Sequence, residues 1–175
     1  MKVFFATIAL SLFALPAFAA ASSTAQPPGS SVPAANGPAD FAAKAGTGNT
    51  FEILSSKLAV TKSQNPAIKA FAQKMIDDHT KAADDMAIAA KAENVTPPTA
   101  LDPDHQKDLD QLGPLSGVEF DSTYVADQTK AHIDAVGLFT AYSTSGKAGP
   151  LKDFAAKTLP TLQMHYQMVM QLPKQ

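Results

Sequence analysis

Apolar residues recur at helical spacing from Phe41 almost to the end of the chain. Four long stretches have this pattern, at about residues 38–63, 66–93, 116–145 and 150–172. A short piece from Asp104 to Leu112 has it too. A period near 3.6 residues is typical of helices that bury one face, whereas the strict alternation that would indicate β-strands does not occur. The pattern therefore predicts an all-α protein with four long helices and one short helix.

Helix-start signals mark the boundaries of these stretches. Asn65 and Asp102 are capping residues, and each is followed by a proline, which suits the first position of a helix. Ser116 has a glutamate three residues later, which is the spacing of a capping box. The connection over residues 94–115 is long, and the other two are short. We therefore expect a four-helix bundle of the ferritin-like or up-and-down kind, with a short helix in the connection between helix 2 and helix 3.

The N-terminal segment differs in composition from the helical part. A basic start is followed by an apolar run over residues 3–15 and then by Ala17-Phe18-Ala19, a pattern that signal peptidase cleaves. We expect a signal peptide at residues 1–19, a flexible linker rich in Pro, Ser, Gly and Ala at residues 20–38, and the folded domain at residues 39–172. Because no later stretch is apolar enough to span a membrane, we expect a mature periplasmic protein, secreted across the inner membrane and without a transmembrane segment.

Composition and charge exclude several classes of protein. The chain contains no cysteine, so the packed core has to stabilise the fold without disulfides. Charged residues make up 17% of the chain, the formal net charge is -2, and no cluster of Lys or Arg follows a helix face. A basic surface for nucleic acid is therefore not expected. A protein partner in the cell envelope and a second copy of the chain both remain open as partners.

The candidate chemistry lies in the histidines. The chain has four, and His79, His132 and His165 each fall on the apolar side of a different long helix. Glu52 falls among small residues on one side of the first helix. With a rise of about 1.5 Å per residue, Glu52 and His79 lie roughly 20 Å from the turn that joins their helices, and the other two lie roughly 22 to 26 Å from theirs. We therefore expect the four side chains to form one layer at mid-height of the bundle.

Such a layer has two interpretations. Buried imidazoles and a carboxylate must either bind a cation or satisfy one another, because an unpaired buried polar group costs free energy. In the first interpretation, one divalent ion such as Zn²⁺, Cu²⁺ or Fe²⁺ is bound by Glu52, His79, His132 and His165. In the second, these side chains form a hydrogen-bonded network with Gln128, Tyr124 or trapped water, and the network only fixes the register of the helices.

A carboxylate-bridged di-iron centre does not fit the sequence. Di-iron bundles place a glutamate three residues before a ligand histidine on two of their helices. Here those positions hold Ile76 before His79 and Leu162 before His165. The sequence also contains no catalytic triad, phosphate loop or cofactor motif. We therefore expect a metal-binding protein or an interaction module before we expect an enzyme.

Several short segments resemble a known family. They are Phe71 to His79 (FAQKMIDDH), Phe120 to Tyr124 (FDSTY), Ala131-His132 and Leu159 to His165 (LPTLQMH). Together they are similar to the bacterial exported family catalogued as domain of unknown function 4142, whose members are often labelled predicted outer membrane proteins. The resemblance covers nearly all of residues 39–172, and Glu52 also matches a motif position of the family. It implies a ferritin-like four-helix domain behind a signal peptide, and it implies no activity.

Overall fold

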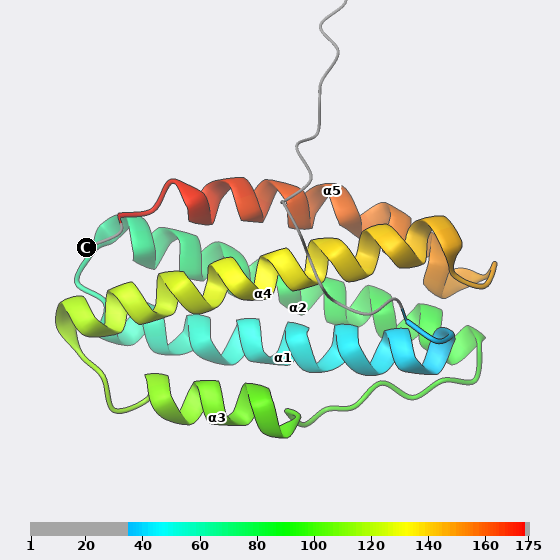
Figure 1. Ribbon diagram of the computed structural model, residues 1–175, viewed down its shortest axis with the longest axis horizontal. Helices are drawn as coiled ribbons and strands as arrows, with labels where there is room; N and C mark the ends of the chain where they lie inside the picture. Colours follow the sequence, from blue (N-terminus) through cyan, green and yellow to red (C-terminus); the bar gives the residue numbers. More distant parts are fainter. Residues whose placement is uncertain (1–34, 174–175) are drawn as a thin grey trace, which may run out of the picture.

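A computed structural model of the chain describes residues 35–173, which form five α-helices and no strand (Figure 1). The helices are α1 (Pro38–Lys62), α2 (Pro66–Ala92), α3 (Pro103–Leu112), α4 (Gly117–Ser145) and α5 (Pro150–Met170). The prediction of an all-α protein is confirmed for this range, and the helix bounds lie within a few residues of those predicted. The predicted signal peptide and most of the predicted linker lie outside the described residues.

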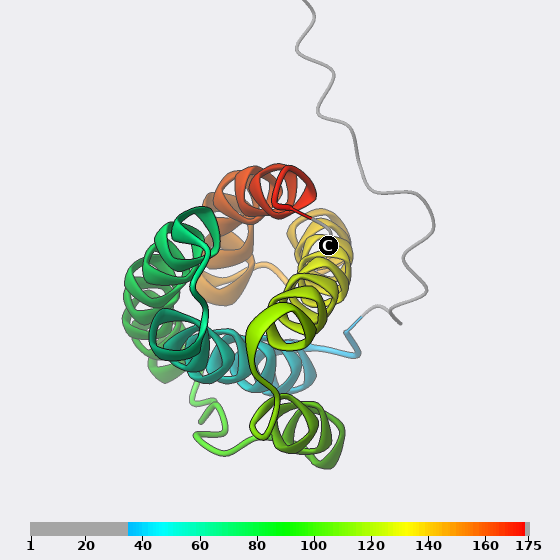
Figure 2. The same cartoon turned by 90° about the vertical axis from the view of Figure 1, so that its left-hand side faces the viewer.

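The four long helices pack side by side. α1 packs most closely against α2, and α4 packs most closely against α5. α1 also contacts α4, and α2 contacts α5, so that the end view shows a ring in the order α1, α2, α5, α4 (Figure 2). The short helix α3 lies outside this ring, against α1 and α4. The chain from α2 to α4 returns along the length of the molecule, so α2 and α4 run in the same direction (Figure 1).

Local capping signals explain two of the helix starts. The Asn65 side chain accepts hydrogen bonds from the backbone N–H groups of Ala67 and Ile68, and the Asp102 side chain accepts one from the N–H of His105. The predicted capping box at Ser116 is wrong, because Ser116 makes no side-chain cap hydrogen bond. The next residue, Gly117, has a φ of +58°. This left-handed conformation at the first helical position disrupts the regular geometry that a capping box requires.

Two hydrophobic clusters make up the core, one in each half of the bundle. One cluster contains Phe41, Met86, Phe139 and Phe154 with their neighbours. The other contains Ile68, Phe71, Met75 and Phe120 with theirs. On every long helix, a buried polar side chain lies between the residues of the two clusters; these side chains are Glu52, His79, His132 and His165. The core is therefore interrupted at mid-height by one polar layer.

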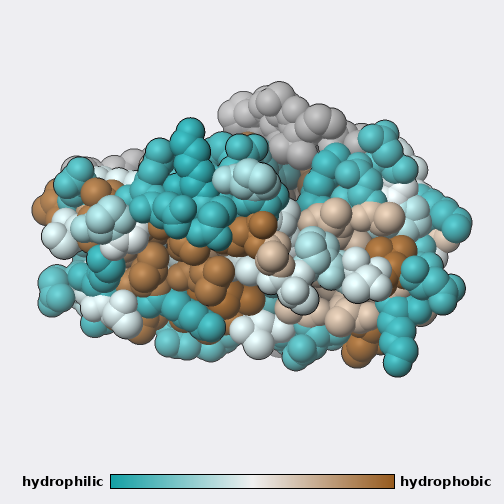
Figure 3. Space-filling view, turned by 90° about the horizontal axis from the view of Figure 1, so that it is seen from below, coloured by the Kyte–Doolittle hydropathy of each residue, from teal (hydrophilic) through white to brown (hydrophobic). Residues whose placement is uncertain are grey.

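The surface combines charged and apolar side chains. Figure 3 shows the face on which α3 lies, where hydrophilic side chains surround smaller apolar areas. Within residues 35–173, no helix is long and apolar enough to cross a membrane.

Candidate metal centre

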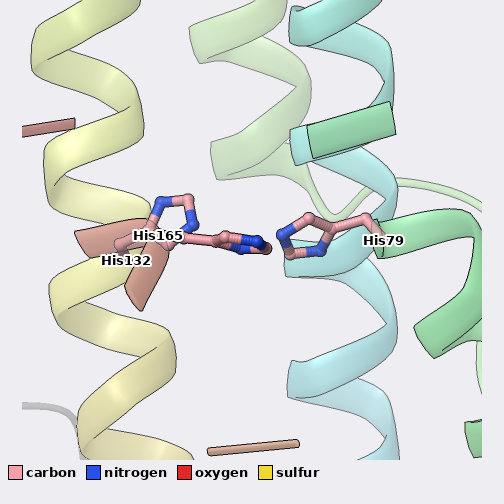
Figure 4. Close-up of side chains that lie close together, drawn as sticks. All are labelled: His79, His132 and His165. Atoms are coloured by element: carbon pink, nitrogen blue, oxygen red, sulfur yellow. The ribbon is translucent and has the colours of Figure 1, made fainter. Parts of the chain in front are cut away.

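Three histidine rings meet inside the bundle, one each from α2, α4 and α5 (Figure 4). His79, His132 and His165 are 3%, 0% and 1% exposed. Their ring centroids lie 5.9 Å apart for His79 and His132, and 5.5 Å apart for the other two pairs. One nitrogen from each ring lies within 4.8 Å of one nitrogen from each of the others. The helices therefore bring together three histidines that are far apart in the sequence.

The tautomer of His132 follows from its hydrogen bond. Its Nδ1 lies 2.8 Å from the backbone carbonyl oxygen of Gln128. A carbonyl oxygen can only accept, so Nδ1 carries the proton and donates it. Burial lowers the pKa of His132 to about 3, which keeps the ring neutral. The other nitrogen, Nε2, therefore has a free lone pair, and it has no hydrogen-bond partner in the described part of the chain.

His79 and His165 are arranged in the same way. His79 Nδ1 lies 2.9 Å from Asn49 Oδ1, and His165 Nε2 lies 2.7 Å from Asp78 Oδ2. Burial lowers the pKa of both histidines, and for His165 the bond to Asp78 opposes that effect. Burial alone would raise the pKa of Asp78, but hydrogen bonds from Lys74 and His165 outweigh it and hold that pKa below its usual value. Asp78 is therefore an ionised acceptor, and the Nε2 of His165 is its donor.

Each ring thus has one nitrogen held by an acceptor and one nitrogen left free. The free atoms are Nε2 of His79, Nε2 of His132 and Nδ1 of His165, all buried and without a hydrogen-bond partner among residues 35–173. Buried polar atoms of this kind are rare, because each one loses its hydrogen bond to water. A metal ion is a suitable partner for three neutral imidazole lone pairs. Zinc–nitrogen bonds of about 2.0–2.1 Å set ligand nitrogens about 3.4 Å apart, a spacing below the 4.8 Å within which one nitrogen of each ring lies here.

Glu52 lies on the opposite side of two of these rings from their free nitrogens. Its Oε2 is 3.1 Å from His79 Nδ1, and its Oε1 is 3.1 Å from His132 Nδ1. The structure therefore brings all four residues of the predicted layer together. The group whose ligand atoms are mutually close, however, consists of the three histidines without Glu52. Burial of Glu52, which is 3% exposed, raises its pKa to about 8.

The residues that orient the rings differ from those expected. The side chains of Gln128 and Tyr124, expected as partners of the histidines, instead contact serines of α1: Gln128 Nε2 donates to Ser55 Oγ at 3.0 Å, and the Tyr124 hydroxyl lies 2.9 Å from Ser56 Oγ. Asn49 and Asp78, which orient His79 and His165, were not predicted. Asn49 lies three residues before Glu52 and so shares its helix face, which is a signal the sequence contains.

The comparisons with known proteins give one match. A family model described as "Domain of unknown function (DUF4142)" matches residues 22–172. No curated protein and no solved structure matches the chain. The matched range includes all five helices and the whole histidine layer. The description of the family names no activity, ligand or partner, so function has to be inferred from the site.

Proposed function

The chain belongs to the DUF4142 family, and from that premise we propose that it binds one divalent transition-metal ion through His79, His132 and His165. One observation carries this proposal: the three rings converge with one unpartnered nitrogen each, while a protein acceptor holds the other nitrogen. Histidine ligands in metal sites usually donate their second N–H to a carboxylate or a carbonyl, which fixes ring and tautomer. Asp78, Asn49 and the Gln128 carbonyl supply these acceptors here.

The donor set favours a particular group of ions. Three neutral imidazoles suit Zn²⁺, Cu²⁺ or Fe²⁺, whereas Mg²⁺ and Ca²⁺ prefer oxygen ligands. A bridged di-iron centre would need more carboxylates than Glu52 alone provides in this layer. We assign Glu52 to the outer sphere, where it orients His79 and His132. Its charge would help to balance the charge of the ion.

The ring of four long helices and the connection that returns along the bundle support a ferritin-like four-helix fold for the domain. We further propose that residues 1–19 direct export to the periplasm and that residues 20–38 tether the domain.

Storing, buffering or sensing an ion is the role that needs nothing beyond this site. If the protein does not bind metal, the buried layer serves as a polar network that fixes helix register.

Metal analysis and thermal melting test this proposal. Tag-free protein should contain one equivalent of Zn, Cu or Fe, and chelation should lower its melting temperature. An ion that binds only the folded state stabilises it by about 2.7 kcal/mol at 100 times its Kd, or roughly 5 to 10 °C in a domain of this size. Identical melting curves in chelator and in equimolar Zn²⁺, Cu²⁺, Fe²⁺ or Mn²⁺ would reject the metal site and leave the polar network.

Glu52→Gln tests the outer-sphere assignment. Glutamine keeps the size of the side chain but cannot become a carboxylate. Changing an outer-sphere partner typically weakens metal binding by about 10- to 100-fold, so we expect that loss in a competition titration with a chromophoric chelator. Retention of one tightly bound equivalent at a raised Kd supports the assignment. Complete loss of binding in a folded variant would instead make Glu52 a ligand.

A further inference from the structure

A cavity extends from the surface into one half of the bundle. It has a volume of about 270 Å³. Protein interiors are close-packed and contain few spaces larger than a water molecule, so a space of this size is unusual. Two of its lining residues, Asp104 of α3 and Lys130 of α4, are exposed, so the cavity opens where α3 lies beside the ring of long helices (Figure 2). An engineered apolar cavity of about 150 Å³ binds benzene, and this cavity therefore has room for a benzene ring and a short chain.

The cavity is separate from the proposed metal centre. Its inner end is closed by Asn49, Glu52 and His79, and neither His132 nor His165 lines it. Asn49 and Glu52 contact Nδ1 of His79, whereas the free nitrogens of all three rings are buried. A molecule in the cavity therefore does not reach the ion. A ligand site here would be a second site, and it would not depend on the proposed function.

Apolar side chains form the walls of the cavity. Alanines from three of the long helices leave its space open because their side chains are short; they are Ala45, Ala82, Ala131 and Ala135. Larger apolar side chains complete the walls, among them Met86, Phe139 and Phe154. Moving an apolar group from water into such surroundings is favourable. The walls therefore select a ligand with an apolar body.

Contacts between α1 and the start of α3 fix the mouth of the cavity. The N–H of Asp102 donates to Thr47 Oγ1 at 2.9 Å, and the Thr47 hydroxyl donates to Asp102 Oδ2 at 3.2 Å. Asp102 also caps α3, and both residues line the cavity. Before α3, the chain packs directly on α1, because a Cβ atom at Gly46 would lie 3.3 Å from Pro98 Cδ. The mouth is thus formed before a ligand binds, which lowers the entropic cost of binding.

The lining of the cavity contains more carboxylates than ammonium groups. Its charged residues toward the mouth are Asp102, Asp104, Asp108, Asp134, Lys44 and Lys130. Both lysines already have a partner: Lys44 Nζ lies 2.9 Å from Asp40 Oδ2, and Lys130 Nζ lies 3.1 Å from Asp134 Oδ2. Asp102 contacts His105. Within residues 35–173, no ion pair neutralises Asp104 or Asp108, which lie one turn apart on α3.

The pKa of Asp127, on α4, supports an excess of negative charge in this region. Burial, and after it the charge of Asp108, raise this pKa to about 6, and the opposing effect of Lys130 is smaller. A cation at the mouth would be attracted by these carboxylates, whereas an anion would be repelled. The charge at the mouth therefore favours a ligand with a positive group.

We propose that the cavity binds a small organic ammonium ion, with its apolar body between the long helices and its charged group at the mouth beside Asp104 and Asp108. At the mouth the ammonium group keeps part of its hydration, so its charge is not buried against the apolar walls. The cavity provides the site, and the two carboxylates select the charge of the ligand. Size, an apolar body and one positive group define the class of molecule that fits.

Calorimetry with three probes of similar size tests this proposal on the full chain near neutral pH, in the presence of chelator. The probes are 4-phenylbutylammonium, 4-phenylbutan-1-ol and 4-phenylbutanoate, which differ in charge at one end. We expect the ammonium ion to bind at least tenfold more tightly than the carboxylate, with the alcohol between them. No binding of the ammonium ion, or binding of the alcohol or the carboxylate that is as tight, overturns the proposal. Because chelator is present, the absence of a metal site would not alter these results.

Two alanine-to-leucine substitutions on α4 test the position of the site. Ala135 lines the cavity, so Ala135→Leu should fill part of it and lower the affinity for 4-phenylbutylammonium at least tenfold. Ala126 is exposed and does not line the cavity, so Ala126→Leu should leave the affinity within a factor of about three. Ala131→Leu replaces Ala135→Leu if that variant does not fold. Unchanged binding in a folded variant with leucine in the cavity shows that the ligand binds elsewhere.

A second matched pair tests the charge. Asp104→Asn with Asp108→Asn should lower the affinity for 4-phenylbutylammonium about tenfold, since a partly exposed ion pair contributes roughly two- to fivefold. The affinity for the alcohol should change little. Asp84→Asn with Asp110→Asn removes the same charge from exposed positions outside the cavity and should have little effect on either probe. An equal loss in both double variants would mean that only net charge matters, and it would contradict the assigned position of the ammonium group.

Discussion

His132→Ala should abolish the rise in melting temperature that a divalent ion produces in the wild-type protein. His132 is fully buried, and its Nε2 is one of the three free nitrogens. Two histidines would remain, and they cannot bind the ion with an affinity comparable to that of three. In chelator, the variant should still be less stable than the wild type by about 1–3 kcal/mol, because a buried hydrogen bond is lost. Melting in chelator and in Zn²⁺ separates the two effects.

His105→Ala provides the matched control. His105 is the fourth histidine of the chain, and it lies on α3, where its Nδ1 contacts Asp102 Oδ2 at 2.8 Å. It is not part of the group of three close ligand atoms. The control should keep the full metal-dependent rise in melting temperature. If His132→Ala keeps that rise as well, the ion binds elsewhere and the assigned centre is wrong.

Stability of the metal-free protein should pass through a maximum near pH 6.5. The folded-state pKa values of His79, His132 and His165 are lowered, so the unfolded chain takes up more protons below about pH 6.5 and stability falls on acidification. The pKa of Glu52 is raised from 4.5 to about 8, so its contribution is present at low pH and is lost as the pH rises through that window. Above pH 6.5, of these four groups only Glu52 still changes the stability. Its ionisation should lower the free energy of unfolding by about 2 kcal/mol as the pH rises.

Urea unfolding in chelator at several pH values measures this profile. Burial raises the pKa of Asp127 to about 6. Its effect on stability therefore falls at pH values below the maximum, where it is opposite in sign to the effect of the histidines. The pKa of Tyr124 is raised by burial and lies above the range tested. Glu52→Gln should remove the decline between about pH 6.5 and 8. Bound Zn²⁺ should also remove it, because a nearby cation favours the ionised carboxylate. A stability that does not change over this range without metal would contradict the raised pKa of Glu52.

Sequence periodicity was sufficient for most of the secondary structure. The starts at Pro66 and Pro103 were predicted because Asn65 and Asp102 are local signals that act within three residues. The capping box at Ser116 was predicted incorrectly, since its spacing was right but Gly117 adopts a left-handed conformation. A residue pattern reports which interactions are available locally. It does not show which backbone conformation the chain adopts where the helix begins.

The sequence by itself determined that three histidines and Glu52 would share one depth, because helix rise and face follow from residue number. Tertiary structure decided which ring nitrogen stays free in His79 and His165, whereas the partner of His132 lies one turn back in its own helix. The contact between Asn49 and His79 joins α1 and α2, and the contact between Asp78 and His165 joins α2 and α5. Glu52 was placed among the ligands by depth, and side-chain orientation put it beside the protonated nitrogens instead. The path of α3 along the bundle, and with it the cavity, also depended on how the helices pack, because periodicity fixes each helix but not the distances between helices.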